Sequence, residues 1–349
     1  MTIEERKSYF VQVGKFLSLF GDKTNNSVKI TPHNERFFNE LNDKIDHSIH
    51  YNGWFTRENV IFSLQQWSKA LTQSNLDQWL EPYKFDKPEQ KTVAIIMAGN
   101  IPLVGFHDFV SVLISGHKVL VKQSSNDKQL LPVIAGFLMN IAPEFEERIK
   151  FTEEKLTNFD AVIATGSNNT ARYFEYYFSG KPNIIRKNRN SVAILTGNES
   201  KEELEALGED VFRYFGLGCR NVSKLYVPEN YNFDAFFKAM YPWNTLLNSA
   251  KYSNNYDYNK AVYLMSEFKL LENGFLILKE DQSFGSPIAT LFYEKYEDEK
   301  ELQEKLEQNK ENLQCVVGTN AEVDFGQTQQ PKLWDYADGV DTLKFLEEL

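Results

Sequence analysis

The spacing of hydrophobic residues in the first part of the chain is that of amphipathic helices. Apolar side chains recur at intervals of three and four residues through much of the first eighty positions, most clearly in NVIFSLQQWSKALTQ, residues 59–73. Pro82 and Pro88 follow and mark where this pattern stops, because proline ends helices. We therefore expect a helical region ahead of the first strand.

From Thr92 onward, short continuous apolar runs alternate with helix-like segments. The predicted strands are TVAIIMA (92–98), KVLVK (118–122), FDAVIAT (159–165) and SVAILTG (191–197). The predicted helices between them cover residues 102–114, 130–142 and 168–178. Such strands, separated by helices, indicate a parallel sheet that is covered on both faces. Ligands of these sheets bind beyond the carboxyl ends of the strands, so the residues that follow each strand are candidates for a site.

A second series of elements follows the strand at 191–197. It consists of helices over 199–216 and 233–240, strands over 223–227, 274–279, 286–293 and 313–319, and a charged helix over 297–312. A chain of 349 residues exceeds what one hydrophobic core usually serves. We therefore expect an α/β protein with two lobes.

Composition narrows the classes of function. The chain has 38 Lys and Arg against 49 Asp and Glu, a net charge of −11, so it offers no basic field for a nucleic-acid backbone. Its two cysteines lie far apart in the sequence, which favours a reducing compartment over a disulfide framework. The segment MTIEERKSYF lacks the apolar core of a secretory signal, and no apolar stretch reaches the length of a membrane span. We expect a cytoplasmic protein.

Cys219 does not have the surroundings of a structural cysteine. It lies in FGLGCRNVSKLYVP, residues 215–228, directly after two closely spaced glycines and just ahead of a predicted strand. Cys315, in contrast, lies within the apolar strand LQCVVG, as an inert core residue would. A thiolate that attacks an acyl carbon must face a cleft, and Gly216 and Gly218 would let a substrate approach the backbone closely. The alternative for Cys219 is a small apolar residue in a glycine turn.

Four segments at strand ends carry a family resemblance. They are AGNIP (98–102), GHKVLVKQSS (116–125), ATGSNNTARYF (164–174) and FGLGCRNVSKLYVPENYNFDAFF (215–237). In this order and spacing, from about residue 93 to about 319, they resemble the aldehyde dehydrogenase superfamily, and within it the long-chain acyl-CoA reductases that include the LuxC fatty-acid reductase.

The resemblance implies a fold and a division of the chain. The implied fold is α/β, with two lobes that are each built on a mostly parallel sheet with flanking helices. A helical prelude and a Rossmann-like cofactor-binding domain would occupy residues 1–190, and the catalytic domain with the cysteine nucleophile would occupy 191–320. A C-terminal return segment, 321–349, would follow.

The resemblance also implies two catalytic residues. Cys219 is similar to the superfamily's nucleophile, which attacks the acyl carbon. Asn100 is similar to the residue whose side-chain amide stabilises the resulting oxyanion, together with the backbone N–H of the nucleophile itself. Losing one such donor typically costs about 3 kcal/mol of transition-state stabilisation. Taken alone, Gly-Asn-Ile-Pro would be only a turn after a strand.

Lys122, Ser125, Gly166 and Ser167 are the residues that the resemblance assigns to the cofactor. Lys122 is similar to the lysine that contacts the adenosine ribose, and Ser125 stands where many NAD-preferring relatives have a glutamate. That carboxylate would repel a 2′-phosphate, so its absence permits NADPH, with NADH as the alternative. Gly166 and Ser167 turn a strand into a helix, whose first N–H groups suit a diphosphate.

Two segments depart from the superfamily pattern. Hydrolytic members have a glutamate that activates water, but the corresponding stretch, residues 184–195, contains no carboxylate. We therefore expect slow deacylation by water and CoA as the natural thiol partner. The E-x-F-G-P segment is represented by EDQSFGSP, residues 280–287, where Gln282 takes the place of the glutamate and Glu280 is a candidate substitute.

The expected activity is the NADPH-dependent reduction of a long-chain fatty acyl-CoA to the aldehyde, with CoA as the leaving group. Two alternatives remain open: a shorter-chain acylating aldehyde dehydrogenase, and a non-catalytic binding or assembly subunit with the same fold. The family analogy adds an acyl-protein synthetase as a candidate partner and acyl donor, and we expect a homo-oligomer.

The histidines are weaker candidates. His47 and His50 have helical spacing but no further ligands nearby in the sequence, which favours surface residues over a metal site. His107 and His117 lie within and just after the helix that follows Asn100, where they could relay a proton or pack between helices.

Overall fold

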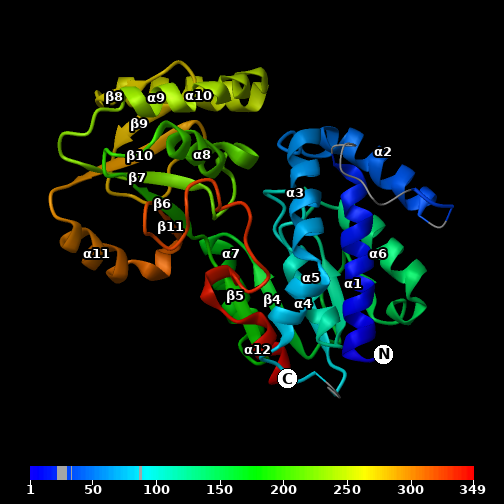
Figure 1. Cartoon of the computed structure of the whole chain (residues 1–349). Coiled ribbons are helices and arrows are strands. Elements are labelled where there is room, and N and C mark those ends of the chain that lie inside the picture. The colour runs from blue at the N-terminus through cyan, green and yellow to red at the C-terminus, as the bar shows by residue number, and fades with distance from the viewer. Residues whose placement is uncertain (22–29, 33, 86–88) are drawn as a thin grey trace. The chain divides into compact units, whose positions relative to one another are not determined.

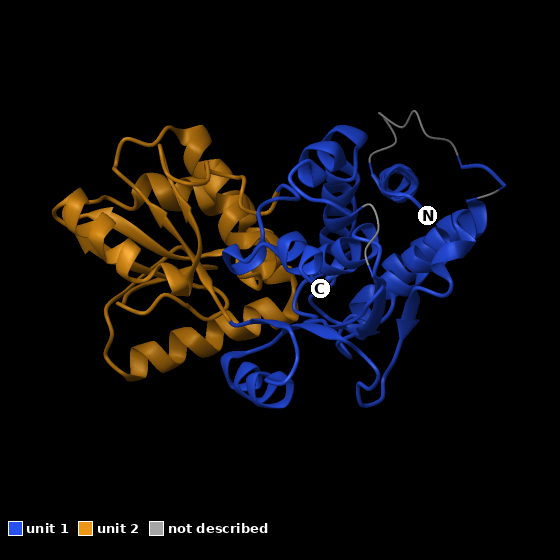
Figure 2. Cartoon of the chain, turned by 90° about the horizontal axis from the view of Figure 1, so that it is seen from below, with its two compact units in different colours: residues 1–187, 332–349 blue, residues 188–331 orange. Residues whose placement is uncertain are grey.

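The computed structural model describes residues 1–21, 30–32, 34–85 and 89–349 (Figure 1). The chain divides into two compact units: residues 1–187 with 332–349 form unit 1, and residues 188–331 form unit 2 (Figure 2). The resemblance had suggested boundaries after residues 190 and 320. Pro88 lies outside the described residues.

Unit 1 is built on a five-stranded sheet in which all strands are parallel. Its strands are β1 (Thr92–Ile96), β2 (Lys118–Lys122), β3 (Ile149–Phe151), β4 (Ala161–Thr165) and β5 (Asn183–Arg186), in the order β3-β2-β1-β4-β5. Its helices are α1 (Ile3–Leu17), α2 (Glu35–Tyr51), α3 (Arg57–Ala70), α4 (Gln73–Leu80), α5 (Phe106–Ile114), α6 (Leu130–Ile141), α7 (Asn168–Phe178) and α12 (Thr342–Glu347). The chain adds strands on one side of β1 and then on the other, so β1 and β4 flank a topological switch point.

Different helices cover the two faces of this sheet. Val93 and Ile95 of β1 belong to a large core cluster with apolar residues of α1, α5 and α6. Ala94 of the same strand points to the other face, where it clusters with Phe174 and Phe178 of α7 packed alongside. Burial on both faces explains why these strands are apolar throughout. The prediction of a parallel sheet covered on both faces is therefore confirmed for the strands at 92–98, 118–122 and 159–165, whereas the strand predicted at 191–197 belongs to the sheet of unit 2.

The last residues of the chain are part of unit 1. The buried guanidinium of Arg186 in β5 pairs with the buried carboxylate of Asp108 in α5, and it also donates to the Thr342 hydroxyl at the start of α12 (3.0 Å). The Trp79 indole N–H donates to the hydroxyl of Tyr336 (2.9 Å). These contacts join the C-terminal segment to elements far away in the sequence.

Unit 2 is built on a six-stranded sheet that is parallel except for one edge pair. Its strands are β6 (Asn190–Ile194), β7 (Val222–Pro228), β8 (Leu270–Glu272), β9 (Ile277–Glu280), β10 (Thr290–Tyr296) and β11 (Leu313–Val317), in the order β11-β6-β7-β10-β9-β8, with β8 and β9 antiparallel. Its helices are α8 (Lys201–Phe212), α9 (Asp234–Met240), α10 (Ala250–Met265) and α11 (Glu299–Gln308). Helices α8 and α9 pack on one face and α11 packs on the other. Both units thus show the mostly parallel sheets with flanking helices that were expected.

Several elements differ from the prediction in their limits. The helix expected over 102–114 begins at Phe106, because Leu103 has a φ of 58° that no α-helix accommodates. The helix expected over 199–216 ends at Phe212 because Tyr214 and Phe215 also have positive φ. Helix α10 was not predicted at all. No helix in the described parts of the chain is both long and apolar enough to cross a bilayer.

Candidate active site

Three of the predicted site segments lie at one edge of the unit 1 sheet. Asn100 follows β1, Lys122 ends β2, and Ser167 follows β4. Strand β1 pairs in parallel with both β2 and β4, so that Ile96 lies beside Lys122 on one side and beside Ala164 on the other. These segments therefore meet at the carboxyl edge of the sheet, next to the switch point where ligands of such sheets bind.

The loop that carries Asn100 is held by side chains from other parts of unit 1. The buried side-chain amide of Asn52 donates to the carbonyl oxygen of Gly99 (3.2 Å). The buried hydroxyl of Ser63 donates to the carbonyl oxygen of Pro102 (3.0 Å). Asn100 itself is exposed between these two anchored residues. Its side chain is thus presented to solvent from a backbone that is held on both sides.

Asp127 supports the same loop through a buried carboxylate. Its Oδ2 accepts a hydrogen bond from the N–H of Leu103 (2.9 Å), the residue with left-handed backbone. Its Oδ1 is covered and has no hydrogen-bond partner among the described residues. Burial raises the pKa of Asp127 to about 6. Keeping this carboxylate ionised therefore costs stability at neutral pH.

We predict that Asp127→Asn raises stability at pH 8 by about 2 kcal/mol and has little effect near pH 3.5. Because the pKa is raised, the folded protein binds more protons than the unfolded chain between about pH 4 and 6. The stability contributed by this carboxyl is complete below that window and is lost as the pH rises through it. Asparagine keeps an oxygen for the Leu103 N–H but does not ionise. Chemical unfolding at the two pH values measures the difference.

Asp160→Asn is the matched control for this prediction, because the exposed Asp160 carboxylate also accepts a backbone N–H, from Thr92 (2.7 Å). Equal stability changes for Asp127→Asn at both pH values would show that the Asp127 carboxylate does not titrate in the expected window.

The predicted cofactor residues Lys122 and Ser125 lie at the end of β2. The Lys122 ammonium donates to the carbonyl oxygen of Glu154 (2.9 Å), just after β3, and Ser125 is exposed in the following loop. This loop packs against the Asn100 loop at Gly99, where a Cβ atom would come within 2.7 Å of Ser124. Glycine is therefore required at position 99.

Gly166 and Ser167 form the turn between β4 and α7. Ser167 has extended backbone, and its hydroxyl accepts a hydrogen bond from the N–H of Thr170 (3.3 Å), so it is the N-cap of the helix. Ser167, Asn168 and Asn169 are exposed. The N-terminal N–H groups of α7 and the positive end of its dipole consequently lie at the carboxyl edge of the sheet, where they suit an anionic group.

Cys219 lies in unit 2, in an exposed loop just before β7. Ahead of it, Tyr214, Phe215 and Gly216 have φ values of 56°, 58° and 75°, so three consecutive residues adopt left-handed backbone. Such conformations cost on the order of 1 kcal/mol or more for residues other than glycine, and they persist only where surrounding contacts impose them. The loop of Cys219 is therefore strained and must be held by its surroundings.

One such contact comes from β6. The hydroxyl of the fully buried Ser191 donates to the carbonyl oxygen of Cys219 (2.9 Å). On the neighbouring strand β11, Cys315 lies opposite Ser191, and the guanidinium of Arg220 donates to its sulfur (3.3 Å). Cys315 is buried as expected, and burial raises the pKa of its thiol to about 11. Arg220, the residue directly after Cys219, thus contacts the second cysteine.

Residues 49–241 match the family described as acyl-CoA reductase (LuxC). The match covers more than half of the chain and includes Asn100, Lys122, Ser167 and Cys219. The chain belongs to this family. No curated protein matches the sequence.

Solved structures of aldehyde dehydrogenases share the fold. Aldehyde dehydrogenase 21 from Physcomitrella patens, in complex with the reaction product succinate, is 13% identical with a TM-score of 0.63, covering 100% of this chain and 84% of that one. P. syringae AldA indole-3-acetaldehyde dehydrogenase, in complex with NAD+ and IAA, is 13% identical with a TM-score of 0.61, covering 91% and 72%. The NAD+ complex of an aldehyde dehydrogenase from Bacillus cereus is 12% identical with a TM-score of 0.59, covering 91% and 72%.

The expected resemblance to LuxC-type reductases of the aldehyde dehydrogenase superfamily is therefore confirmed. Membership of the LuxC family makes the protein an oxidoreductase of the class that reduces fatty acyl groups to aldehydes. The solved structures, all far below 25% identity, establish the α/β fold.

In this LuxC-family chain, the divergent segment 280–287 is held by the start of β7. The Ser223 hydroxyl donates to the carbonyl oxygen of Phe284 (2.7 Å), and the ammonium of Lys224 donates to that of Gln282 (2.8 Å). Lys224 is fully buried and pairs with Glu294 (2.6 Å). Burial lowers the pKa of Lys224, against the opposing effect of Glu294. The strand that follows Cys219 thus also positions the segment that replaces the E-x-F-G-P motif.

Two of the candidate histidines, His107 and His117, pack against the C-terminal segment of the chain. His107 contacts the carbonyl oxygen of Leu333 (2.8 Å), and His117 contacts that of Leu346 (3.0 Å), both in the C-terminal segment. His117 is buried, and burial lowers its pKa. His47 and His50 are exposed on α2, as expected. The described residues contain no group of three His, Cys, Asp or Glu side chains that could hold a metal ion.

The residues that hold the loops of Asn100 and Cys219 were not predicted from the sequence. These residues, all buried or with buried polar atoms, are Asn52, Ser63, Asp127, Ser191 and Asn221. Four of them lie far from Asn100 or Cys219 along the chain, and nothing in their local pattern distinguishes them. Only Asn221 could have been noticed from the sequence, because it is a polar residue two positions after Cys219 and immediately before an apolar strand.

Proposed function

We propose that this protein reduces long-chain fatty acyl thioesters, with acyl-CoA as the donor, to aldehydes by an acyl-enzyme formed on Cys219, with NADPH as the reductant. The observation that carries the proposal is Cys219 itself. It is exposed, follows a strained turn, and has its carbonyl oxygen held by Ser191, within a region that matches the LuxC reductases.

In the proposed reaction the Cys219 thiolate attacks the thioester carbon, and the oxyanion receives hydrogen bonds from the Asn100 amide and the Cys219 N–H. Collapse expels CoA thiolate, which takes up a proton, and leaves the acyl group on Cys219. Hydride addition to the acyl carbon then gives a thiohemiacetal, which breaks down to aldehyde and free thiolate. One acyl-CoA, one NADPH and one proton yield one aldehyde, one CoA and one NADP+.

The residues at the carboxyl edge of unit 1 fit a nicotinamide dinucleotide, which when bound supplies the hydride. Ser167 caps α7, whose exposed N-terminus lies beside the switch point and would receive the diphosphate. Lys122 would contact the adenosine ribose, and Gly166 would permit close approach to the turn. The exposed Ser125 would leave room for a 2′-phosphate, which is the reason for favouring NADPH over NADH.

Residues 184–195 contain no carboxylate that could activate water. This supports CoA, rather than water, as the molecule that exchanges with the acyl group on the enzyme. Of the two buried polar residues in this stretch, Arg186 pairs with Asp108 and Ser191 bonds to Cys219. Neither is a base that could activate water. A cytoplasmic homo-oligomer that receives acyl groups from CoA or from an acyl-protein synthetase is the corresponding cellular setting.

The direct test is NADPH oxidation by the purified protein with acyl-CoA of eight to eighteen carbons, with trapping of the aldehyde and a parallel series with NADH. Aldehyde in equal amount to oxidised NADPH, with highest rates for long chains, supports the proposal. A preference for short chains would favour the shorter-chain acylating alternative. No oxidation and no acylation of the protein by any donor would instead favour a binding or assembly subunit.

A further inference from the structure

We infer that Asn221 is a positioning residue for Cys219: its buried side chain holds the loop and so directs the backbone N–H of the nucleophile. The inference rests on the proposed function, because it concerns the geometry of attack by Cys219. Asn221 lies two residues after the cysteine and is almost completely buried. It contacts neither substrate nor cofactor in the proposal, and it acts through the loop.

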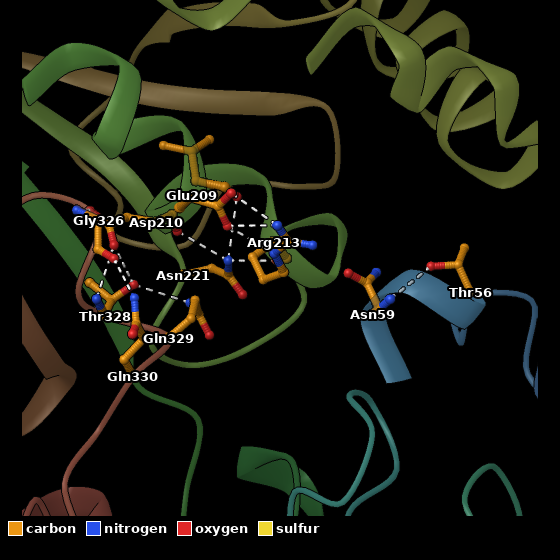
Figure 3. Close-up of polar contacts among 11 residues, drawn as sticks. Thr56, Asn59, Glu209, Asp210, Arg213, Asn221, Gly326, Thr328, Gln329 and Gln330 are labelled. Carbon is orange, nitrogen blue, oxygen red and sulfur yellow. Dashed lines mark hydrogen bonds and ion pairs between the residues drawn. The ribbon is translucent and has the colours of Figure 1, made fainter. Parts of the chain in front are cut away.

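The side chain of Asn221 joins both ends of this loop. Its Oδ1 accepts a hydrogen bond from the N–H of Gly218 (2.8 Å). Its Nδ2 donates to the carbonyl oxygens of Arg213 (2.8 Å) and Asp210 (3.0 Å), as Figure 3 shows for the contacts on the α8 side. An amide group has two N–H donors, so these two short bonds saturate the nitrogen.

The contacts of Asn221 span the strained part of the loop. Tyr214, Phe215 and Gly216, the residues with left-handed backbone, lie between the bond to Arg213 and the bond to Gly218. A side chain that bonds on both sides of a strained run prevents it from relaxing to an ordinary turn. The amide also satisfies carbonyl groups at the end of α8, which otherwise have no partner in the helix ladder.

The bonding of Gly218 determines where the N–H of Cys219 points. The carbonyl oxygen of Gly218 accepts a hydrogen bond from the backbone N–H of Asn221 (3.0 Å). In a trans peptide the C=O and the following N–H point in opposite directions, and the described chain has no cis peptide. The N–H of Cys219 is therefore directed away from Asn221. The side chain of Asn221 holds the preceding peptide plane, that of Leu217 and Gly218, through the N–H of Gly218, so the Gly218–Cys219 plane can turn only about the backbone dihedrals of Gly218.

The end of α8 to which Asn221 is bonded is itself well anchored. The Asp210 carboxylate accepts hydrogen bonds from the N–H of Gly326 (2.6 Å) and from the N–H and hydroxyl of Thr328 (3.0 and 2.8 Å), which Figure 3 also shows. The Arg213 guanidinium forms two hydrogen bonds with Glu209 (both 2.9 Å). The side chain of Asn221 thus connects the loop of Cys219 to a part of unit 2 that further hydrogen bonds hold in place.

The test compares Asn221→Ala with Asn259→Ala. Asn259 is a second buried asparagine of unit 2, whose amide donates to the carbonyl oxygen of Ile288 (2.9 Å), a residue outside the segment 210–221. Three quantities are measured for each variant: the melting temperature, hydrogen exchange of the amides of residues 213–221, and the single-turnover release of CoA from a long-chain acyl-CoA without cofactor. Alkylation by iodoacetamide reports whether Cys219 stays accessible.

We expect Asn221→Ala to slow CoA release about 100-fold and to speed amide exchange in 213–221 by at least about 10-fold, while alkylation changes less than about 3-fold. Asn259→Ala should lower the melting temperature without slowing CoA release. Equal CoA release in the two variants, once both are folded, would overturn the inference. Ser191→Ala, which removes the bond to the Cys219 carbonyl and the contact of the same hydroxyl with the Cys315 thiol, provides a milder variant if Asn221→Ala does not fold, with an expected slowing of about 10-fold.

Failure of the proposed function gives a different result. If the unaltered protein releases no CoA, the acyl-enzyme proposal is wrong. The role of Asn221 in holding the loop is then tested by hydrogen exchange alone. Unchanged protection of residues 213–221 in Asn221→Ala would reject that role.

Discussion

Cys219→Ala is expected to abolish acylation of the protein by acyl-CoA and to lower aldehyde production by a factor on the order of 10⁴ or more. The thiolate is the only group in the proposed reaction that bonds to the acyl carbon, so no other side chain can take over its step. The measurements are the mass of the intact protein after incubation with acyl-CoA without reductant, and the rate of NADPH oxidation with the same donor.

Cys315→Ala is the matched control for this experiment, because these are the two cysteines of the chain. The Cys315 thiol is buried and its pKa is raised to about 11, so it has little thiolate with which to accept an acyl group. Its replacement should leave the added acyl mass in place. Acylation that persists in Cys219→Ala and disappears in Cys315→Ala would reassign the nucleophile, and acylation that persists in both would exclude a cysteine thioester.

The regular part of the fold was predictable from the sequence because its strands are buried on both faces. KVLVK coincides with β2, and the apolar runs at 92–98, 159–165 and 191–197 all contain a strand of a parallel sheet. Short edge strands such as β3 and β8, three residues each, bury too little to give a recognisable run. Helix α10 was missed because its Asn, Asp and Tyr residues have low helix propensity and do not form an apolar stripe.

The ends of elements near the site were the least predictable. Leu103, Tyr214, Phe215 and Ala289 have left-handed backbone although each has a side chain that disfavours it. Local pattern extends a helix or strand through such residues, and only contacts from distant segments impose the turn. Asp127 provides such a contact for Leu103.

The candidate site residues also divide into those that could be predicted from the sequence and those that could not. Asn100 and Cys219 stand next to strands in two of the segments that carry the family resemblance, so the sequence marked them as candidates. Ser191 and Asn221 act by hydrogen bonds to backbone atoms whose partners depend on the complete fold. A buried serine within a strand and an asparagine before one are ordinary in sequence, and their role is visible only in three dimensions.

Asn100→Ala is expected to lower the rate of the acylation step by 10²- to 10³-fold, equivalent to about 3–4 kcal/mol of transition-state stabilisation, with a much smaller change in the concentration of acyl-CoA needed for half-saturation. The side-chain amide would donate to an oxygen that becomes negative only during attack, so its loss affects the transition state more than binding. Single-turnover CoA release at saturating acyl-CoA measures the step directly. The loop itself is held by Asn52, Ser63 and Asp127, so its backbone should keep its position in this variant.

Asn100→Asp tests whether the N–H donor of the side-chain amide, rather than the shape of the side chain, stabilises the oxyanion. Aspartate has almost the same size, but an ionised carboxylate has no N–H to donate and repels a developing oxyanion, so this variant should be at least as slow as Asn100→Ala. A rate within tenfold of the unaltered protein for Asn100→Ala, or a partly restored rate for Asn100→Asp, would show that the oxyanion is stabilised elsewhere. In that case the backbone N–H of Cys219, whose direction Asn221 holds, would be the main donor to the oxyanion. The Asn100 and Asn221 variants together would then separate the contributions of the side-chain donor and the backbone donor.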